Sequence, residues 1–441
     1  MTVLIVIVFI IGYILIAFEH KLKIDKASTA LLTGVICWLL LLFGIANMPV
    51  NNLATGAETS TLAYVQDSLF HHLGAISEIL FFLLGAMTIV ELIDVHHGFR
   101  VITERINTSS RVRLLWMISW ITFFLSAGLD NMTTAIVMCA LLRKILKKEE
   151  DLWLFGGFVI IAANAGGAWS PIGDVTTIML WIGGQVTTLN IIESTFLAST
   201  ACLVVPLLFA TYFLKKEKKS LEIFSHNEIK STVETTTFER NLLFFLGIAS
   251  LLAVPVFKSI THLPPYMGIM LMLGLLWFVT DVIHRHKTPD IRREFSVAYI
   301  LHKIDTPTIL FFLGILLAVS SLDVSGHLHV LAEILDKNLG NIYLINGSIG
   351  ILSSVVDNVP LVAACMGMYN LTEFPPDHNF WELLAYCAGT GGSLLIIGSA
   401  AGVAAMGILK INFHWYLMRI SLYALSGYLC GIAVYYLQHH A

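Results

Sequence analysis

Charge is scarce in this sequence. Only 13% of its 441 residues are Asp, Glu, Lys or Arg, about half the share in an average soluble domain, while 57% are hydrophobic. This composition excludes a soluble enzyme and a disordered chain. The net charge of −4 offers no basic surface for a phosphate backbone, which excludes a nucleic-acid-binding protein. The six cysteines lie in apolar stretches without metal-ligand spacing, so they predict neither a metal site nor a disulfide framework.

Long apolar runs dominate the chain instead, and they predict an all-α polytopic membrane protein. The first run has no basic segment before it and no small-residue cleavage motif, so we expect an uncleaved membrane helix. About ten transmembrane helices are expected from runs at residues 2–18, 28–47, 75–95, 152–183, 191–214, 241–258, 265–282, 306–322, 380–409 and 414–437.

Two further apolar runs, 114–142 and 342–371, are interrupted by Asp130-Asn131 and Asp357-Asn358. Both flanks of the first run are rich in Lys and Arg, and both flanks of the second are poor in them. Because basic residues concentrate on cytoplasmic loops, we expect two opposed re-entrant hairpins, each returning to the side from which it entered. Both termini are then external, and all basic residues except Lys258 and Lys337 lie inside.

The two halves of the chain resemble each other. Asp130-Asn131 recurs 227 positions later, and Phe81-Phe82-Leu83 recurs 230 positions later. Gly166-Gly167 and Ile172-Gly173 both recur 225 positions later. With the topology above, this predicts an inverted-topology repeat, a common plan of secondary transporters. The expected divisions are an N-terminal helix and loop (1–27), repeat 1 (28–214, with hairpin 114–147), a cytoplasmic linker and extra helix (215–264), and repeat 2 (265–437, with hairpin 342–371).

Each repeat also contains a long helix that glycine interrupts, at 152–183 and 380–409. Gly166-Gly167 and Ser170-Pro171 weaken the first helix, and Gly391-Gly392 weakens the second. Backbone groups freed inside a membrane need partners from protein, water or ligand. Two hairpin tips and two broken helices therefore predict a binding site near the middle of the membrane.

Three acids lie at these breaks: Asp130, Asp174 and Asp357. A carboxylate inside a membrane is costly and is usually functional. The four broken segments contain no Lys or Arg, so a proton or a bound cation has to match the charge unless a basic residue reaches in from another helix. We expect Asp130 and Asp174 to be the main carriers, with Asp357 assisting. The alternative is that these acids are protonated and only hydrogen-bond the hairpin tips.

Neutral oxygen ligands accompany the acids. Carboxylate, carbonyl and hydroxyl oxygens suit a hard cation, so we expect Na⁺ or Li⁺ at Asp130, Asp174 and Asp357. Ser and Thr hydroxyls can instead bond back to their own helix. The candidate ligands are Asn131, Asn164, Thr176, Thr177 and Asn358, with Ser393, Ser399, Glu78 and Glu91 as further possibilities.

The two motifs of the first half, residues 126–134 (SAGLDNMTT) and 164–177 (NAGGAWSPIGDVTT), resemble those of bacterial NhaD-type Na⁺/H⁺ antiporters. These belong to the ion transporter superfamily, together with arsenite pumps and dicarboxylate carriers. The resemblance implies a secondary transporter without a cofactor that exchanges Na⁺ or Li⁺ for H⁺. It also implies a scaffold with a moving transport unit, a homodimer, and a bacterial cytoplasmic membrane. By motif position it implicates the Asp, Asn and Thr candidates named above.

Two other functions remain open from the sequence. An anion or oxyanion carrier of the same superfamily, for arsenite or a dicarboxylate, is the main alternative. The acid at each hairpin tip departs from the Ser-Asn-Thr tips of dicarboxylate carriers and would repel a dianion. An intramembrane aspartyl protease is a remote alternative suggested by Gly173-Asp174.

Overall fold

The computed structural model describes residues 2–17, 22–45, 61–103, 110–217, 236–355 and 357–440. The regular elements in these ranges are all α-helices. Most of the predicted linker 215–240, and Val356 at the second hairpin tip, lie outside the described residues.

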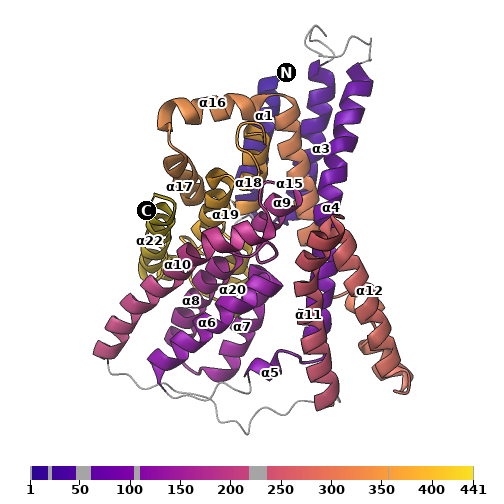
Figure 1. Ribbon diagram of the computed structural model, residues 1–441, viewed down its shortest axis with the longest axis vertical. Coiled ribbons are helices and arrows are strands. Elements are labelled where there is room, and N and C mark those ends of the chain that lie inside the picture. The colour runs from indigo at the N-terminus through magenta and orange to yellow at the C-terminus, as the bar shows by residue number, and fades with distance from the viewer. Residues whose placement is uncertain are drawn as a thin grey trace.

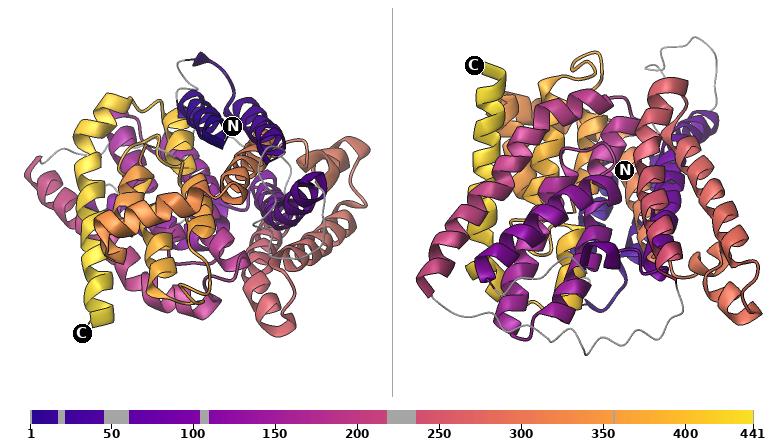
Figure 2. Two further views of the ribbon diagram at one scale, coloured as in Figure 1. Left: turned by 90° about the horizontal axis from the view of Figure 1, so that it is seen from above. Right: turned by 60° about the horizontal axis from the view of Figure 1, so that its bottom comes forward.

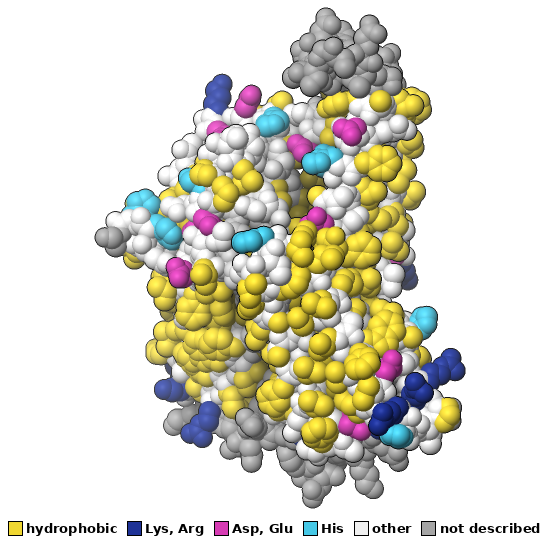
Figure 3. Space-filling model, turned by 45° about the vertical axis from the view of Figure 1, so that its right-hand side comes forward, with side chains coloured by type: hydrophobic (Ala, Val, Ile, Leu, Met, Phe, Trp, Pro, Cys, Tyr) yellow, Lys and Arg dark blue, Asp and Glu magenta, His cyan; other side chains and the backbone are white. Residues whose placement is uncertain are grey.

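Within the described ranges, seven helices are long and apolar enough to cross a membrane. A broad band of hydrophobic side chains covers the middle of the surface in Figure 3, with most of the Lys and Arg side chains toward the lower end. The chain is therefore a polytopic membrane protein, as predicted. The seven helices are α3 (Lys26–Ile45), α4 (Thr61–Val95), α6 (Arg111–Leu129), α10 (Thr188–Glu217), α11 (Thr237–Thr261), α12 (Pro265–His284) and α15 (Thr306–Val324).

The remaining predicted spans are short, broken or bent. α1 (Thr2–Ala17) has 16 residues, and both glycine-interrupted helices are divided, into α8 (Glu149–Gly167) with α9 (Val175–Ile182), and α19 (Asn379–Gly391) with α20 (Ala400–Leu409). The predicted span over 414–437 is present as a bent pair of helices. α21 (Phe413–Arg419) and α22 (Ser421–His440) meet at 51°, because α22 packs along α10 while α21 also contacts α8.

The helices pack into two bundles. The first contains α1, α3, α4, α11, α12 and α15, and the second contains α6 to α10 and α17 to α22. Figures 1 and 2 show the two bundles side by side. α16 (His327–Leu339) covers the upper end of the second bundle, and the short helix α5 (Arg100–Thr103) lies at the lower end. Two other short helices, α13 (Pro289–Glu294) and α14 (Val297–Ile300), connect α12 to α15.

The chain reverses at both predicted hairpin tips. α6 ends at Asp130, and α7 (Asn131–Ile145) follows directly. Arg111 at the start of α6 forms an ion pair with Asp151 in the first turn of α8, just after α7 has ended, so both arms end at the same side. α6 alone is as long as a full span, which the sequence did not predict.

The second reversal joins α17 (Ile342–Leu352) and α18 (Asn358–Met368) across Asp357. Tyr369, directly after α18, donates a hydrogen bond of 3.0 Å to Asp336, near the end of α16 and the start of α17. The two hairpins open toward opposite ends of the molecule in Figure 1. The division of the chain into two inverted repeats stays a prediction.

Glycines at matching positions allow the arms and the broken helices to approach closely. A Cβ atom at Gly166 would collide with the carbonyl oxygen of Phe123 in α6, and one at Gly391 with that of Gly350 in α17. A Cβ at Gly173 would lie 2.9 Å from the Ser126 carbonyl oxygen. The repeated glycines are therefore needed where a hairpin arm meets backbone of the broken helix.

We predict that Gly391→Ala strongly destabilises the protein, because the new methyl group overlaps backbone that cannot rotate away. Overpacking of this kind costs about 1–3 kcal/mol. Gly407 in α20 has open space around its Cβ position, so Gly407→Ala is the matched control. The melting temperature of the purified protein is the measurement. Equal melting temperatures for the two variants would contradict the close packing of α17 on α19.

We also predict that cysteines at positions 113 and 147 react with an impermeant thiol reagent from one side of the membrane, and a cysteine at 372 from the other. Arg113, Lys147 and Thr372 are exposed, and the first two flank the first hairpin. The half-buried Cys430 is replaced by Ala in this experiment, since the other native cysteines are buried. Labelling of 113 and 147 from opposite sides would contradict the re-entrant hairpin.

Candidate functional site

The second halves of the two broken helices begin with the same backbone geometry. Asp174 is the N-cap of α9, with φ −146° and ψ 146°, and Ser399 is the N-cap of α20, with φ −145° and ψ 153°. Both side chains accept hydrogen bonds from backbone N–H groups of the first helical turn, which have no partner within the helix. The two breaks therefore place an acid and a hydroxyl at matching positions.

Asp174 is the centre of a buried hydrogen-bond network. It is only 1% exposed, so protein groups supply its hydrogen-bond partners. The backbone N–H and the hydroxyl of Thr176 each donate to Oδ1 at 3.0 Å. Nδ2 of Asn131, at the first hairpin tip, donates to Oδ2 at 2.6 Å, and Nδ2 of Asn358, at the second tip, lies 3.4 Å from both oxygens. One carboxylate thus joins both hairpins to α9.

Asn164 in α8 extends this network to the second broken helix. Its Oδ1 accepts a hydrogen bond of 3.1 Å from Asn131. Its Nδ2 donates to the hydroxyls of Ser393 and Ser399, at 2.9 Å each. All four of these side chains are buried. The two hairpin tips and the two helix breaks are therefore connected by side chains that the sequence singled out.

The acids at the hairpin tips bond to their own helices. Asp130 accepts hydrogen bonds from the backbone N–H and the hydroxyl of Thr133, at 2.8 and 2.7 Å. Asp357 accepts one from the backbone N–H of Val359 at 3.2 Å. The backbone of Asp130 has φ of +88°, whereas that of Asp357 has φ of −48°. At each tip the asparagine side chain belongs to the central network. The neighbouring aspartate side chain lies beside that network and bonds to its own helix.

The three carboxylates still influence one another. Asp357 and Asp130 both repel the charge of Asp174, Asp357 more strongly. Asp130 also borders a cavity of about 20 Å³ between the bundles, where Leu83 and Met87 of α4 face it. A space of this size holds about one water molecule. Asp130 therefore lies where a small ion or water can sit between the hairpin and the first bundle.

At Asp357 a basic residue does reach in from another helix, the exception that the sequence left open. Lys26, the first residue of α3, attracts the Asp357 carboxylate electrostatically, and its ammonium lies 4.7 Å from the ring centre of Phe311. The Tyr13 hydroxyl, in α1, lies 3.5 Å from the Asp357 carbonyl oxygen. The first bundle thus contacts the second hairpin tip. The sequence around Asp357 alone could not reveal this contact.

Three other candidates lie outside the central network. The Thr177 hydroxyl bonds to the Asp174 backbone, accepting from its N–H at 3.3 Å and donating to its carbonyl at 2.8 Å. Glu78 lies in α4 near Lys258, and Glu91 lies farther along α4 near Lys303. In the described part of the chain, no three His, Cys, Asp or Glu side chains cluster as metal ligands, so Na⁺ at all three acids stays a prediction.

Sequence analysis missed two serines that link the hairpins to the broken helices. The Ser126 hydroxyl donates to the Ala163 carbonyl at 2.6 Å, and that of Ser353 to the Ala388 carbonyl at 2.9 Å. The sequence signal that could have revealed these two contacts is the spacing of the residues, which follows the internal repeat. The serines are 227 residues apart, like the two hairpin aspartates, and the carbonyls are 225 apart, like the repeated glycines.

Lys258, one of the two basic residues that the predicted topology places outside, contacts the end of α9. Its ammonium donates to the Trp181 carbonyl and lies 4.3 Å from the centre of the Trp181 ring. A positive charge is favourable there, because the carbonyl groups at a helix C-terminus carry partial negative charge. Glu78 of α4 attracts the same ammonium. Lys258 thus ties the first bundle to the half-helix that begins at Asp174.

Comparisons with known proteins identify the relatives of this chain. The family model described as citrate transporter matches residues 13–383. Sodium/proton antiporter 2 of Arabidopsis thaliana is 46% identical over 430 residues, which cover 98% of each chain. Sodium/proton antiporter 1 of the same plant is 48% identical over 98% of this chain and 71% of its own. The Na⁺/H⁺ antiporter NhaD of Vibrio cholerae is 30% identical over 98% of this chain and 91% of its own.

The chain belongs to the NhaD-type antiporter family. The resemblance inferred from the two motifs is therefore confirmed, and so is the prediction of a transporter rather than an enzyme. The family covers nearly the whole chain, including both hairpins and both helix breaks. The roles of individual side chains in this antiporter-like protein remain predictions.

We predict that Lys258→Met lowers the melting temperature by several degrees, because it removes the donor to Trp181 and leaves Glu78 without its nearby cation. Removing the cation that attracts a half-buried carboxylate leaves that charge less compensated, which is unfavourable. Adding Glu78→Gln should recover part of the loss, and the exposed Lys337 gives the control variant Lys337→Met. Melting temperatures of Lys258→Met, Glu78→Gln, the double variant and Lys337→Met measure this, and strictly additive effects of the two single changes would contradict a coupling between Lys258 and Glu78.

Proposed function

We propose that this protein exchanges Na⁺ or Li⁺ for H⁺ across a membrane by alternating access, with Asp174 as the shared binding group. The observation that carries the proposal is a single buried carboxylate that accepts hydrogen bonds from amides of two opposed hairpins. The names of the plant and Vibrio cholerae relatives, which are sodium/proton antiporters, support sodium and protons as the exchanged ions.

Competition for Asp174 couples the two ions. A bare carboxylate away from water is unfavourable, and among the residues that the structure describes, none of the hydrogen-bond donors to Asp174 is a Lys or Arg side chain. Either a bound proton or a bound cation removes the uncompensated charge. Because one carboxylate cannot hold both at full strength, binding of the cation releases the proton. This is the chemical requirement for obligatory exchange.

The surrounding side chains supply the other ligands of the cation. In the present arrangement Asn131 and Asn358 direct Nδ2 toward Asp174. Rotation of either amide by half a turn presents Oδ1 instead, which converts a donor into a ligand. The hydroxyl of Thr176 adds a further oxygen. Such an all-oxygen set suits a hard ion such as Na⁺ or Li⁺.

Asp130 and Asp357 supply secondary roles in this scheme. Asp130 lies beside the small cavity between the bundles, where it favours a cation approaching Asp174. Lys26 partly balances Asp357, so we infer that Asp357 tunes the field at Asp174 and carries less of the transported charge. In this scheme the acids of the first half of the chain, Asp130 and Asp174, remain the main carriers of the proton or cation.

Alternating access would expose the site to each side in turn. We infer that the second bundle moves against the first, and that the hairpins, related by an inverted repeat, cover the site from opposite sides. A homodimer, a bacterial cytoplasmic membrane and external termini follow from the resemblance and the charge distribution. Because two relatives come from a plant, the membrane that holds this protein has to be identified by direct localisation of the protein.

A citrate carrier is the competing function, suggested by the match to the citrate transporter family model. Citrate carries several negative charges at neutral pH. Asp174 interacts unfavourably with both Asp357 and Asp130, and its hydrogen-bond partners are neutral groups. The field at the centre therefore favours a cation over citrate.

We predict that everted vesicles containing the protein dissipate a preformed pH gradient on addition of Na⁺ or Li⁺, and that Asp174→Asn abolishes this response. Asparagine retains the shape of the side chain but removes the ionisable group. Asp130→Asn should reduce exchange strongly. Asp67, exposed near the start of α4, gives Asp67→Asn as a control with unchanged exchange.

Normal Na⁺ exchange by Asp174→Asn would overturn the assignment of the shared group. A response to citrate without a response to Na⁺ or Li⁺ would overturn the proposed function itself. Folding of each variant is checked by its melting temperature, so that loss of exchange is not mistaken for loss of structure.

A further inference from the structure

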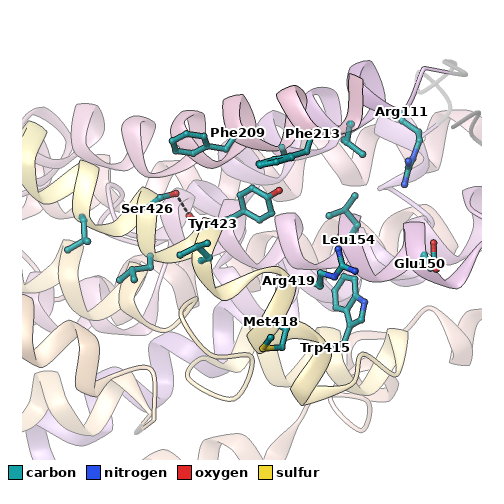
Figure 4. Close-up of a pocket in the computed structure, with 15 residues that line it drawn as sticks. Arg111, Glu150, Leu154, Phe209, Phe213, Trp415, Met418, Arg419, Tyr423 and Ser426 are labelled. Atoms are coloured by element: carbon teal, nitrogen blue, oxygen red, sulfur yellow. Dashed lines mark hydrogen bonds between the residues drawn. The ribbon is translucent and has the colours of Figure 1, made fainter. Parts of the chain in front are cut away.

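A groove lies on the surface of the second bundle, between α10 and the bent pair α21–α22 (Figure 4). Its volume is about 800 Å³, within the range of ligand-binding pockets. Phe209 and Phe213 of α10 form one wall, and Leu422 and Leu429 of α22 form the other. Each of these four side chains is more than half exposed. In a membrane protein such a lining contacts acyl chains.

The two ends of the groove differ in polarity. Figure 4 shows Arg111, Glu150, Trp415 and Arg419 together at one end, and Phe209 and Ser426 toward the other. The 51° bend between α21 and α22 places Trp415 and Arg419 on one helix and the leucines on the next. This distribution matches a molecule with a polar head and apolar tails.

Positive charge is in excess at the polar end. Arg111 is balanced by its ion pair with Asp151. Arg419 is exposed, and no carboxylate in the described part of the chain lies within ion-pair distance of it. Lys215 and Lys216, both exposed, directly follow the lining residues Phe213 and Leu214. Glu150 is the acid among the lining residues, so the basic groups retain net positive charge.

We propose that this groove binds one anionic phospholipid, with its phosphate at Arg419 and its acyl chains along Phe213 and Leu422. An Arg guanidinium forms paired, charge-assisted hydrogen bonds with phosphate oxygens. Trp415 and Tyr423 offer apolar rings with a polar edge, which suit the boundary between head group and acyl chains. Basic pockets between membrane helices hold anionic head groups in this way.

The groove is separate from the exchange site but touches the base of the first hairpin. Arg111, which lines the groove, starts α6, and its partner Asp151 lies in the first turn of α8. A lipid seated beside this ion pair fastens the lower ends of α6 and α8 to α10 and α21. Bound lipid therefore stabilises the second bundle without entering the ion pathway.

The test uses the full-length protein purified in an uncharged detergent and depleted of lipid. Phosphatidylglycerol is added in mixed micelles, with phosphatidylcholine and inorganic phosphate as separate arms. Bound lipid is counted by native mass spectrometry, and the melting temperature is recorded in parallel. Arg419→Gln and Phe213→Ala remove the head-group and acyl-chain contacts. Arg293→Gln and Phe245→Ala, exposed positions outside the groove, are the matched controls.

We expect one tightly bound phosphatidylglycerol and a higher melting temperature with it than with phosphatidylcholine or phosphate. Arg419→Gln should weaken binding about tenfold, the scale of one charge-assisted hydrogen bond. Arg419→Lys should retain part of the binding, and both control variants should bind normally.

Three results would overturn the proposal. These are equal binding of phosphatidylcholine, unchanged binding in Arg419→Gln, or equal losses in the groove and control variants. A change of oligomeric mass in Phe213→Ala with unchanged lipid binding would show that a second copy of the chain occupies the groove. Ion exchange by vesicles tests the exchange site separately, so failure here leaves the proposed function standing.

Discussion

The hydrogen bonds to the Asp174 carboxylate are the constraint on which the architecture depends. A carboxylate that is 1% exposed within a membrane protein has to be satisfied from inside the chain. Two hairpin tips, one helix N-terminus and the Thr176 hydroxyl converge on it. The convergence requires both hairpins to penetrate the second bundle, which in turn requires glycine where their arms meet the broken helices. The helix breaks and hairpin tips, where the backbone is irregular, therefore lie around the Asp174 carboxylate.

Much of this plan could be predicted from the sequence because it depends on local chemistry. Gly-Gly pairs, the Asp-Asn dipeptides and the distribution of Lys and Arg indicated the breaks, the tips and the reversals of the chain. The central network of Asn131, Asn164, Asp174, Thr176, Asn358, Ser393 and Ser399 consists of residues singled out by those patterns. The boundary of α4 and the bend near Ile420 were missed, because packing against other helices sets them.

Contacts between the two bundles could not be predicted, because they join residues far apart in the chain. Nothing in the segment around Asp357 reveals that Lys26 lies near it. The contact of Lys258 with Trp181 is equally remote in sequence, although the isolated charge in an apolar helix was a visible sign. The carboxylates of Asp130 and Asp357 cap their own helices. All three acids lie at breaks in the sequence, but the two tip acids do not occupy the same place in the hydrogen-bond network as Asp174.

The two hairpin tips carry the same Asp-Asn pair but differ in backbone energy. Asp130 adopts a φ of +88°, which disfavours any residue with a side chain, and Asp357 has an ordinary φ of −48°. Such a conformation costs about 1–3 kcal/mol and persists only while its surroundings hold it. Loosening the first tip would release that energy, whereas loosening the second would not. In the proposed alternating-access cycle, the two tips are therefore energetically unequal although their sequences match, and a rearrangement of the first tip relieves strain that the second tip does not hold.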